Sequence, residues 1–262
     1  MSDANGKAAD SVEIEWGSAA KPADVEDKLN SGEYDAFFVT HNETSTTAMT
    51  PLEGFGKICA DNDVMFCVDA VSSASGVKIE TDKLGIDVLV TGTQKCFAVA
   101  PGLAMTAVSE AALERSAKIE NRGLYFDYQD IAKKAAKDNT PSTPPIPQIH
   151  ALGYQCERIL KEGLDNRFAR HTEMAGYAQR WVRQNFELFC EDWCLSNTVT
   201  GAKNNKGADL FDLSAKLGER DYQFSNGYGK LKGEAFRIAH MGERTLPELK
   251  KYLEDIEDIL GL

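Results

Sequence analysis

Short apolar segments recur through the first half of the chain, and polar or helix-like stretches separate them. They occupy residues 36–40, 64–68, 86–90 and 103–108. Their β-branched and aromatic residues favour strands, and the segments are too apolar to leave one face in water. Strands of this kind, alternating with helices, are typical of a parallel sheet with helices on both sides. The pattern therefore predicts an α/β fold.

Other stretches have weaker patterns. Val12, Ile14 and Trp16 alternate with charged residues, which predicts a strand with one buried face. Proline is favoured in the first turn of a helix, so we expect Pro51 to open a helix that extends to Ala60. Helices are also expected at 23–29 and through most of 110–138.

The second half of the chain predicts two long helices and then a smaller α+β domain. The helices cover about 148–163 and 167–184, and they precede short strands at 187–190, 198–200 and 235–239 and a helix at 210–217. We therefore expect the large domain at 1–147, a connecting helix at 148–163 and a small domain at 164–262.

The last helix has a clear start signal. Thr245 and Glu248 have the spacing of a capping box. The apolar residues on one face of this helix are Leu249, Leu253, Ile256 and Leu260. By contrast, the four prolines in 139–147 exclude a helix there, and composition leaves open whether that stretch is a linker or an ordered loop.

The composition restricts the kinds of molecule that the protein can be expected to bind. Apolar residues make up 42% of the 262 residues, enough for a buried core, and the net charge is −12. Such an acidic chain is poorly suited to nucleic acid or an anionic membrane surface. The six cysteines lack metal-type spacing, and residues 1–7 are polar, without a secretory signal pattern. We expect a cytoplasmic protein without a bound metal or membrane span.

Polar clusters follow three of the predicted strands. They are residues 41–46, Asp69, and residues 91–95, which end at Lys95. The carboxyl ends of parallel strands share one edge of the sheet, where ligands of open α/β sheets bind. Taken singly, Lys95 could be a solvated loop lysine, Asp69 a turn residue and His41 an ordinary loop histidine.

A lysine and an aspartate at one sheet edge suit a specific chemistry. A lysine amine can form a Schiff base with a carbonyl. If the carbonyl belongs to pyridoxal phosphate, an aspartate is needed to keep the ring nitrogen protonated. Threonine and serine hydroxyls, with backbone amides, would hold the phosphate. The order of Asp69 and then Lys95, one strand later, favours this combined interpretation.

These stretches resemble the class V aminotransferases, and most closely the alanine/serine–glyoxylate (serine–pyruvate) aminotransferase group. The resemblance lies in residues 40–46, 68–73, 91–95 with Pro101-Gly102, and 227–242. It covers nearly the whole chain in collinear order. It implies fold type I of the pyridoxal-phosphate enzymes, with a mostly parallel sheet between helices and a smaller α+β C-terminal domain. It also implies a homodimer with active sites at the subunit interface.

The resemblance implies a role for each site residue. Lys95 would be the Schiff-base lysine and proton shuttle, and Asp69 would pair with the pyridine nitrogen. Arg237 would hold the substrate carboxylate bidentately. The remaining cofactor contacts would be Thr44 at the ring hydroxyl, Thr93 and Gln94 near the phosphate, and Thr143 at the phosphate of the neighbouring subunit.

The activity implied is transfer of an amino group from serine or alanine to glyoxylate or pyruvate. Members of the family begin well before this chain's Met1, and their upstream portion carries a glycine-rich phosphate turn, a ring-stacking aromatic residue and the first strands. Three explanations stay open: a separate N-terminal chain, a fragment, or a catalytically silent binding protein on the same fold. A lyase or desulfurase is a further alternative, because Cys96 follows Lys95.

Overall fold

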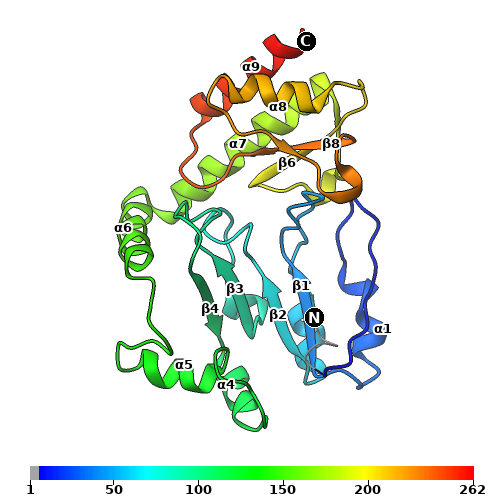
Figure 1. Ribbon diagram of the computed structural model, residues 1–262. Coiled ribbons are helices and arrows are strands. Elements are labelled where there is room, and N and C mark those ends of the chain that lie inside the picture. The colour runs from blue at the N-terminus through cyan, green and yellow to red at the C-terminus, as the bar shows by residue number, and fades with distance from the viewer. Residues whose placement is uncertain (1–5) are drawn as a thin grey trace.

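The four apolar segments of the first half form one sheet, in the order β1-β2-β3-β4 (Figure 1). The protein is described by a computed structural model that covers residues 6–262. The strands are β1 (Ala36–Thr40), β2 (Met65–Asp69), β3 (Val88–Gly92) and β4 (Ala104–Val108). β1, β2 and β3 are parallel, whereas β4 is antiparallel to β3. No helix separates β3 from β4, and a short connection of this kind joins antiparallel strands.

Three helices pack on one face of this sheet. They are α1 (Glu26–Leu29), α2 (Phe55–Asp61) and α3 (Thr81–Leu84). Phe37 of β1 stacks on Phe55 of α2 with ring centroids 5.4 Å apart, and Phe66 of β2 is fully buried beside them. Aromatic packing and burial of this kind stabilise the layer by several kcal/mol, since a buried phenylalanine contributes about 1.5–3 kcal/mol.

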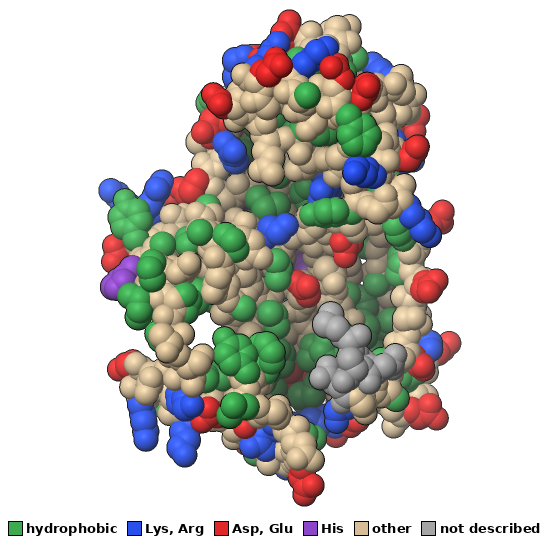
Figure 2. All heavy atoms as spheres, viewed as in Figure 1, with side chains coloured by type: hydrophobic (Ala, Val, Ile, Leu, Met, Phe, Trp, Pro, Cys, Tyr) green, Lys and Arg blue, Asp and Glu red, His purple; other side chains and the backbone are tan. Residues whose placement is uncertain are grey.

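The opposite face of the sheet is more open. Phe38 is paired with Cys67 in the register of β1 and β2, and its side chain is 75% exposed. Hydrophobic side chains are visible over this front face in the space-filling view (Figure 2). The two faces of β1 are therefore unequally covered by the residues that the structure describes.

Two expectations from the N-terminal third are wrong. Residues 12–16 form no strand, and Trp16 makes only an isolated bridge with Ser18 and is 54% exposed. Alternation alone supplies no neighbouring strand, and β1 pairs only with β2 within residues 6–262. Pro51 does not open α2, which begins at Phe55 after Gly54, whose φ of 92° interrupts a helical backbone.

The chain then leaves the sheet through four helices. They are α4 (Glu110–Ala117), α5 (Tyr128–Ala135), α6 (Ile146–Glu162) and α7 (Leu164–Asn185). The proline-rich stretch is extended up to Pro145, and α6 begins slightly earlier than predicted because Pro147 fits its first turn. Gly163, with a φ of 85°, separates α6 from α7. Of the mostly helical stretch predicted at 110–138, residues 110–117 and 128–135 are helical and residues 118–127 are not.

The C-terminal residues form a second, antiparallel sheet in the order β5-β6-β8-β7. Its strands are β5 (Glu187–Leu188), β6 (Val199–Lys203), β7 (Ser225–Asn226) and β8 (Ala235–Ala239), with helices α8 (Leu210–Gly218) and α9 (Leu246–Leu260). Short 3-10 turns occur at Pro22–Asp24, Asp192–Cys194 and Gly229–Leu231. The two sheets lie in separate lobes, and α7 runs into the second one (Figure 1).

The second lobe has its own core, which includes the fully buried residues Phe236, Leu213 and Leu253. The predicted capping box of α9 is confirmed, because the Thr245 backbone N–H donates to Glu248 Oε2 at 2.8 Å. Leu249, Leu253 and Ile256 are buried on one face, as expected. Across residues 6–262, no helix has the length and apolar character needed to span a membrane.

Candidate active site

The carboxyl ends of β1, β2 and β3 lie at the edge of the first sheet that faces the second lobe (Figure 1). The parallel register pairs Thr40 with Asp69, and Asp69 with Val90. The three polar clusters that follow these strands therefore share one edge, as the sequence predicts. The shared edge results directly from the parallel arrangement of the three strands.

Asp69 and Lys95 are both accessible at this edge. Asp69 is the last residue of β2 and is exposed, and its Oδ1 accepts a hydrogen bond of 2.9 Å from the Val71 N–H. Lys95 is half-buried in the turn after β3, where its carbonyl accepts the Ala98 N–H at 2.9 Å. Within residues 6–262, neither side chain forms an ion pair.

The residues just before Lys95 shape the turn. Thr93 is fully buried, and its hydroxyl donates to the Ala100 carbonyl at 2.9 Å. Gln94 is exposed and folds back over Gly92, where a Cβ would lie 2.6 Å from Gln94 Oε1. Thr93 thus holds the turn together, whereas Gln94 presents its amide to the surface.

Arg237 connects the two lobes at the same edge. It lies on β8, and its Nη1 donates to the Thr44 carbonyl at 3.3 Å while Nη2 donates to the Asn226 carbonyl at 2.9 Å. Its guanidinium lies over the ring of Tyr228, 4.1 Å from the centroid. Its Nε is buried without a hydrogen-bond partner in the described chain. The Thr44 hydroxyl bonds Ser72 in the loop that follows β2.

Thr143 is the predicted residue that the structure does not bring to this edge. It is exposed in the loop between α5 and α6, and its side chain has no hydrogen bond to residues 6–262. That loop runs along the side of the first sheet, from α5 to α6 (Figure 1). A contact with the neighbouring subunit stays a prediction.

Burial shifts the pKa of three other side chains near the strand ends, namely Cys96, His41 and His240. Cys96 is fully buried, and burial raises the pKa of its thiol to about 12, which argues against Cys96 as a nucleophile in the desulfurase alternative. Burial lowers the pKa of His41 to about 4, and it lowers the pKa of His240 to about 3. Both imidazoles are therefore neutral near pH 7.

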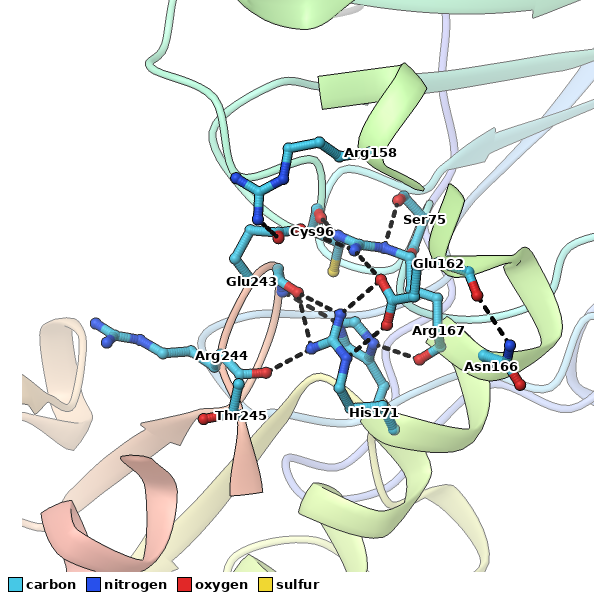
Figure 3. Close-up of polar contacts among 12 residues, drawn as sticks. Ser75, Cys96, Arg158, Glu162, Asn166, Arg167, His171, Glu243, Arg244 and Thr245 are labelled. Atoms are coloured by element: carbon cyan, nitrogen blue, oxygen red, sulfur yellow. Dashed lines mark hydrogen bonds and ion pairs between the residues drawn. The ribbon is translucent and has the colours of Figure 1, made fainter. Parts of the chain in front are cut away.

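Sequence reasoning missed one residue that contacts these loops. Arg167 of α7 is fully buried and donates to the Cys96 carbonyl, directly after Lys95 (Figure 3). A lone arginine on a helix has the pattern of a surface residue, and only the tertiary contacts reveal its burial. Its charge is matched by Glu162 and Glu243, which come from different segments.

Comparison with known proteins identifies the family. Residues 3–206 match the model of the family described as Aminotransferase class-V. The chain is 37% identical over 238 residues to an uncharacterized aminotransferase of Methanocaldococcus jannaschii, covering 88% of this chain and 61% of the relative. It is 33% identical to the L-aspartate–glyoxylate aminotransferase of Paracoccus denitrificans, covering 89% and 61%.

A solved structure agrees with the sequence relatives. The crystal structure of an alanine–glyoxylate aminotransferase from Nostoc sp. superposes with a TM-score of 0.88 at 26% identity, covering 94% of this chain and 67% of that one. The chain belongs to the class-V aminotransferase family and has the α/β fold of its pyridoxal-phosphate-dependent members. It spans 61% of the length of each of the two curated relatives named above.

The residues at the edge fit the cofactor of this family. Pyridoxal phosphate has an aldehyde, a basic ring nitrogen and a phosphate, and these groups require an amine, a carboxylate and hydrogen-bond donors. Lys95 and Asp69 supply the first two from exposed or half-exposed positions. The Gln94 amide and the backbone of its turn are donors at the same edge. The buried Nε of Arg237, which has no hydrogen-bond partner among residues 6–262, adds a cationic donor that suits a substrate carboxylate.

Proposed function

We propose that this chain carries the lysine and carboxylate centre of a pyridoxal-phosphate-dependent aminotransferase. The proposed reaction moves an amino group from a small amino acid, such as serine or alanine, to glyoxylate or pyruvate. The observation that carries the proposal is the placement of Asp69 and Lys95, both free of ion pairs within residues 6–262, at the edge that Arg237 approaches from the second lobe. Relatives named as glyoxylate aminotransferases support the choice of acceptor.

Each residue has a defined task in this proposal. The cofactor, when bound, withdraws electrons from the substrate Cα and so makes its proton acidic. Lys95 Nζ would hold the cofactor carbonyl until the amino acid displaces it, and the freed amine would then carry the proton from Cα to the cofactor carbon. Asp69 would keep the ring nitrogen protonated through its carboxylate, which is exposed at the end of β2. Gln94 and Thr44 would contact the phosphate and the ring hydroxyl, and Thr93 would hold the turn.

Arg237 would bind the substrate carboxylate. Of the two hydrogen bonds that Arg237 donates, the longer one joins Nη1 to the Thr44 carbonyl at 3.3 Å. A substrate carboxylate would replace this neutral acceptor with a charged one. The Asn226 carbonyl and the ring of Tyr228 would keep the guanidinium in place during the exchange. Binding would thus change a contact that spans the two lobes.

We also propose the partners and the location. A homodimer is supported by the exposed apolar side chains of α6, namely Ile146, Ile149, Tyr154 and Leu160. Such a dimer would bring Thr143 towards the partner's site. The domain boundaries at 147 and 163 would then make α6 the helix that connects the two domains.

All six cysteines are free thiols, which supports a reducing, cytoplasmic location. The charge of −12 disfavours nucleic acid as a partner.

One observation favours a second candidate, a chain that is active only when another polypeptide covers the open face of the first sheet. Phe38 on that face is 75% exposed, and the outer edge of β1 pairs with no strand of residues 6–262. An exposed aromatic residue beside a free strand edge is a typical docking surface for further polypeptide. A separate chain equivalent to the N-terminal part of the family would fit there.

A visible absorption spectrum with added pyridoxal phosphate tests the proposal. We expect a band for the wild-type chain and for the control Lys57→Ala, which changes an exposed lysine of α2, and no band for Lys95→Ala. Borohydride reduction should fix the label on Lys95. Addition of alanine or serine should shift the band, and glyoxylate should restore it.

The outcomes separate the two candidates. A band in Lys95→Ala of equal strength would exclude the proposed role of Lys95. If the wild-type chain gives no band alone but gives one after a separately made N-terminal segment is added, the second candidate is correct. No band under either condition would leave the fold without the proposed chemistry.

A further inference from the structure

Arg167 is a fully buried arginine whose three nitrogens all have hydrogen-bond partners (Figure 3). Its Nε donates to the Ser75 carbonyl at 2.9 Å, and its Nη2 donates to the Cys96 carbonyl at 2.6 Å. Its Nη1 donates to Glu162 Oε2 and Glu243 Oε1, each at 2.9 Å. The two carboxylates offset the buried charge, and the two carbonyls accept from Nε and from one of the two N–H groups of Nη2.

The two carbonyls belong to the loops that carry the proposed reacting residues. Ser75 lies in the loop that starts after Asp69, and Cys96 directly follows Lys95. The loops also touch each other closely, because a Cβ at Gly76 would lie 2.7 Å from Cys96 Sγ. One guanidinium therefore bridges the backbone of both loops at the point where they meet.

We propose that Arg167 is a positioning residue that holds the Lys95 turn in register with the Asp69 loop. The inference rests on the proposed function, since it assigns Lys95 and Asp69 to one reaction. Arginine suits the role because its planar fork addresses several acceptors at fixed angles, which the point charge of lysine cannot do. A displacement of about 1 Å in such a site can slow a reaction about 100-fold.

Arg170 provides a matched control one turn further along α7. It donates to Glu162 Oε1 at 2.7 Å and to the Gly242 carbonyl at 3.1 Å, and it also bonds the carbonyl of Arg244. It therefore shares a carboxylate with Arg167 but donates to neither the Ser75 nor the Cys96 carbonyl. Arg170→Lys perturbs the same polar cluster and leaves both loop carbonyls with their donor.

Hydrogen exchange of the chain without cofactor tests positioning directly. The amides of Ala98 and Val99 close the Lys95 turn, through hydrogen bonds to the carbonyls of Lys95 and Thr93. Arg167→Lys should accelerate exchange of these amides about ten-fold or more, because the loss of a charged hydrogen bond loosens the turn locally. Arg170→Lys should leave them unchanged. Equal rates in the two variants would overturn the inference.

Capture of pyridoxal phosphate by Lys95 gives a second readout. The rate at which the lysine-dependent band forms should fall about 100-fold in Arg167→Lys and stay near the wild-type rate in Arg170→Lys. Losses in both variants that simply follow their melting temperatures would show a structural role only. If Arg167→Lys does not fold, Glu243→Gln removes one charged partner of Arg167, and it should change both readouts in the same direction by a smaller factor.

The two readouts also separate this inference from the proposed function. If the wild-type chain shows no lysine-dependent band, the proposed function fails, while the exchange of the 93–99 turn still decides whether Arg167 holds it. If the band forms normally in a folded Arg167→Lys protein, the positioning role fails and the proposed function stands.

Discussion

At the scale of single residues, Arg237 is the most specific assignment that the second lobe contributes. We predict that Arg237→Lys weakens binding of the amino acid about 10- to 100-fold, since a lysine loses the two-pronged hydrogen bonding worth about 1.5–3 kcal/mol to a charged group. Titration of alanine or serine into cofactor-loaded protein, followed by the absorption shift, measures the effect. The formation of the lysine-dependent band itself should not change.

An exposed arginine of the same lobe provides the control for that substitution. Arg183 pairs with Asp192 at 2.6 Å, and its side chain is 43% exposed, so Arg183→Lys should leave the titration unaltered. Equal affinities for Arg237→Lys and the wild type would rule out the carboxylate role. Loss of the band in Arg237→Lys would show instead that Arg237 acts on the cofactor.

Sequence reasoning reached the residues that follow strands and missed the one that lies on a helix. Asp69 and Lys95 could be predicted together because a parallel sheet places all strand ends at one edge. Arg167 has no such signal, since its partners Ser75, Cys96 and Glu243 come from three loops that only the tertiary fold assembles. Burial of a charge depends on these long-range partners and not on the local pattern.

At the scale of elements, the end of β3 depends on a glycine, because the Gln94 side chain occupies the space that a side chain at Gly92 would need. A Cβ at Gly92 would lie 2.6 Å from Gln94 Oε1, the flexible end of a side chain. We predict that Gly92→Ala turns Gln94 away and lowers the affinity for pyridoxal phosphate, while the free energy of unfolding changes by less than about 1 kcal/mol. A spectroscopic titration and a chemical denaturation curve measure the two quantities.

Gly218, at the end of α8, is a suitable comparison because a Cβ there meets no atom within 4 Å. Gly218→Ala should leave cofactor affinity unaltered. An affinity equal to the wild type in Gly92→Ala would show that the position of Gln94 is irrelevant to cofactor binding. A large loss of stability in Gly92→Ala would show that the clash is not relieved by the side chain.

Sequence patterns predicted the strands that pair with another strand, and they failed where no neighbouring strand is present. The strands β1 to β4 follow their apolar segments closely because each pairs with at least one neighbouring strand. The alternation at 12–16 has the same local pattern as a strand, yet Trp16 stays 54% exposed because no strand of the described chain lies beside it. Turns such as the one at Gly54, with its φ of 92°, shift helix starts that Pro51 alone would place earlier.

At the scale of the whole molecule, the contact between the lobes is rich in buried polar groups. Thr198, just before β6, donates to the Ser72 carbonyl at 2.7 Å. Arg237 adds its bond to the Thr44 carbonyl. Polar contacts in a low-dielectric setting fix one relative placement of two surfaces more sharply than apolar packing does. The lobes therefore hold the strand ends and Arg237 in a defined arrangement.

Buried histidines in this region make the stability of the protein depend on pH. Burial lowers the pKa of His41 and of His171 to about 4 and that of His240 to about 3, from an ordinary value of 6.5. A lowered pKa in the folded state means that the unfolded chain binds protons first as the pH falls. These histidines should thus cause no change in the free energy of unfolding above pH 7 and a decline between pH 6.5 and 4, by at most about 1.4 kcal/mol per pH unit for each histidine.

Urea unfolding at a series of pH values measures this decline. Replacement of His240 by glutamine, which can still approach Thr200, should reduce the slope between pH 6.5 and 4, because one proton-binding difference is removed. His150→Gln, at an exposed position of α6, should leave the slope unchanged.

Glu162 affects stability in a more acidic pH range than the histidines. Hydrogen bonds from Arg170 and Arg167 lower its pKa below the ordinary 4.5, so its contribution to the free energy of unfolding is lost only at more acidic pH. A stability that stays constant from pH 7 to pH 4 would show that the buried imidazoles take up protons in the folded protein as readily as in the unfolded chain.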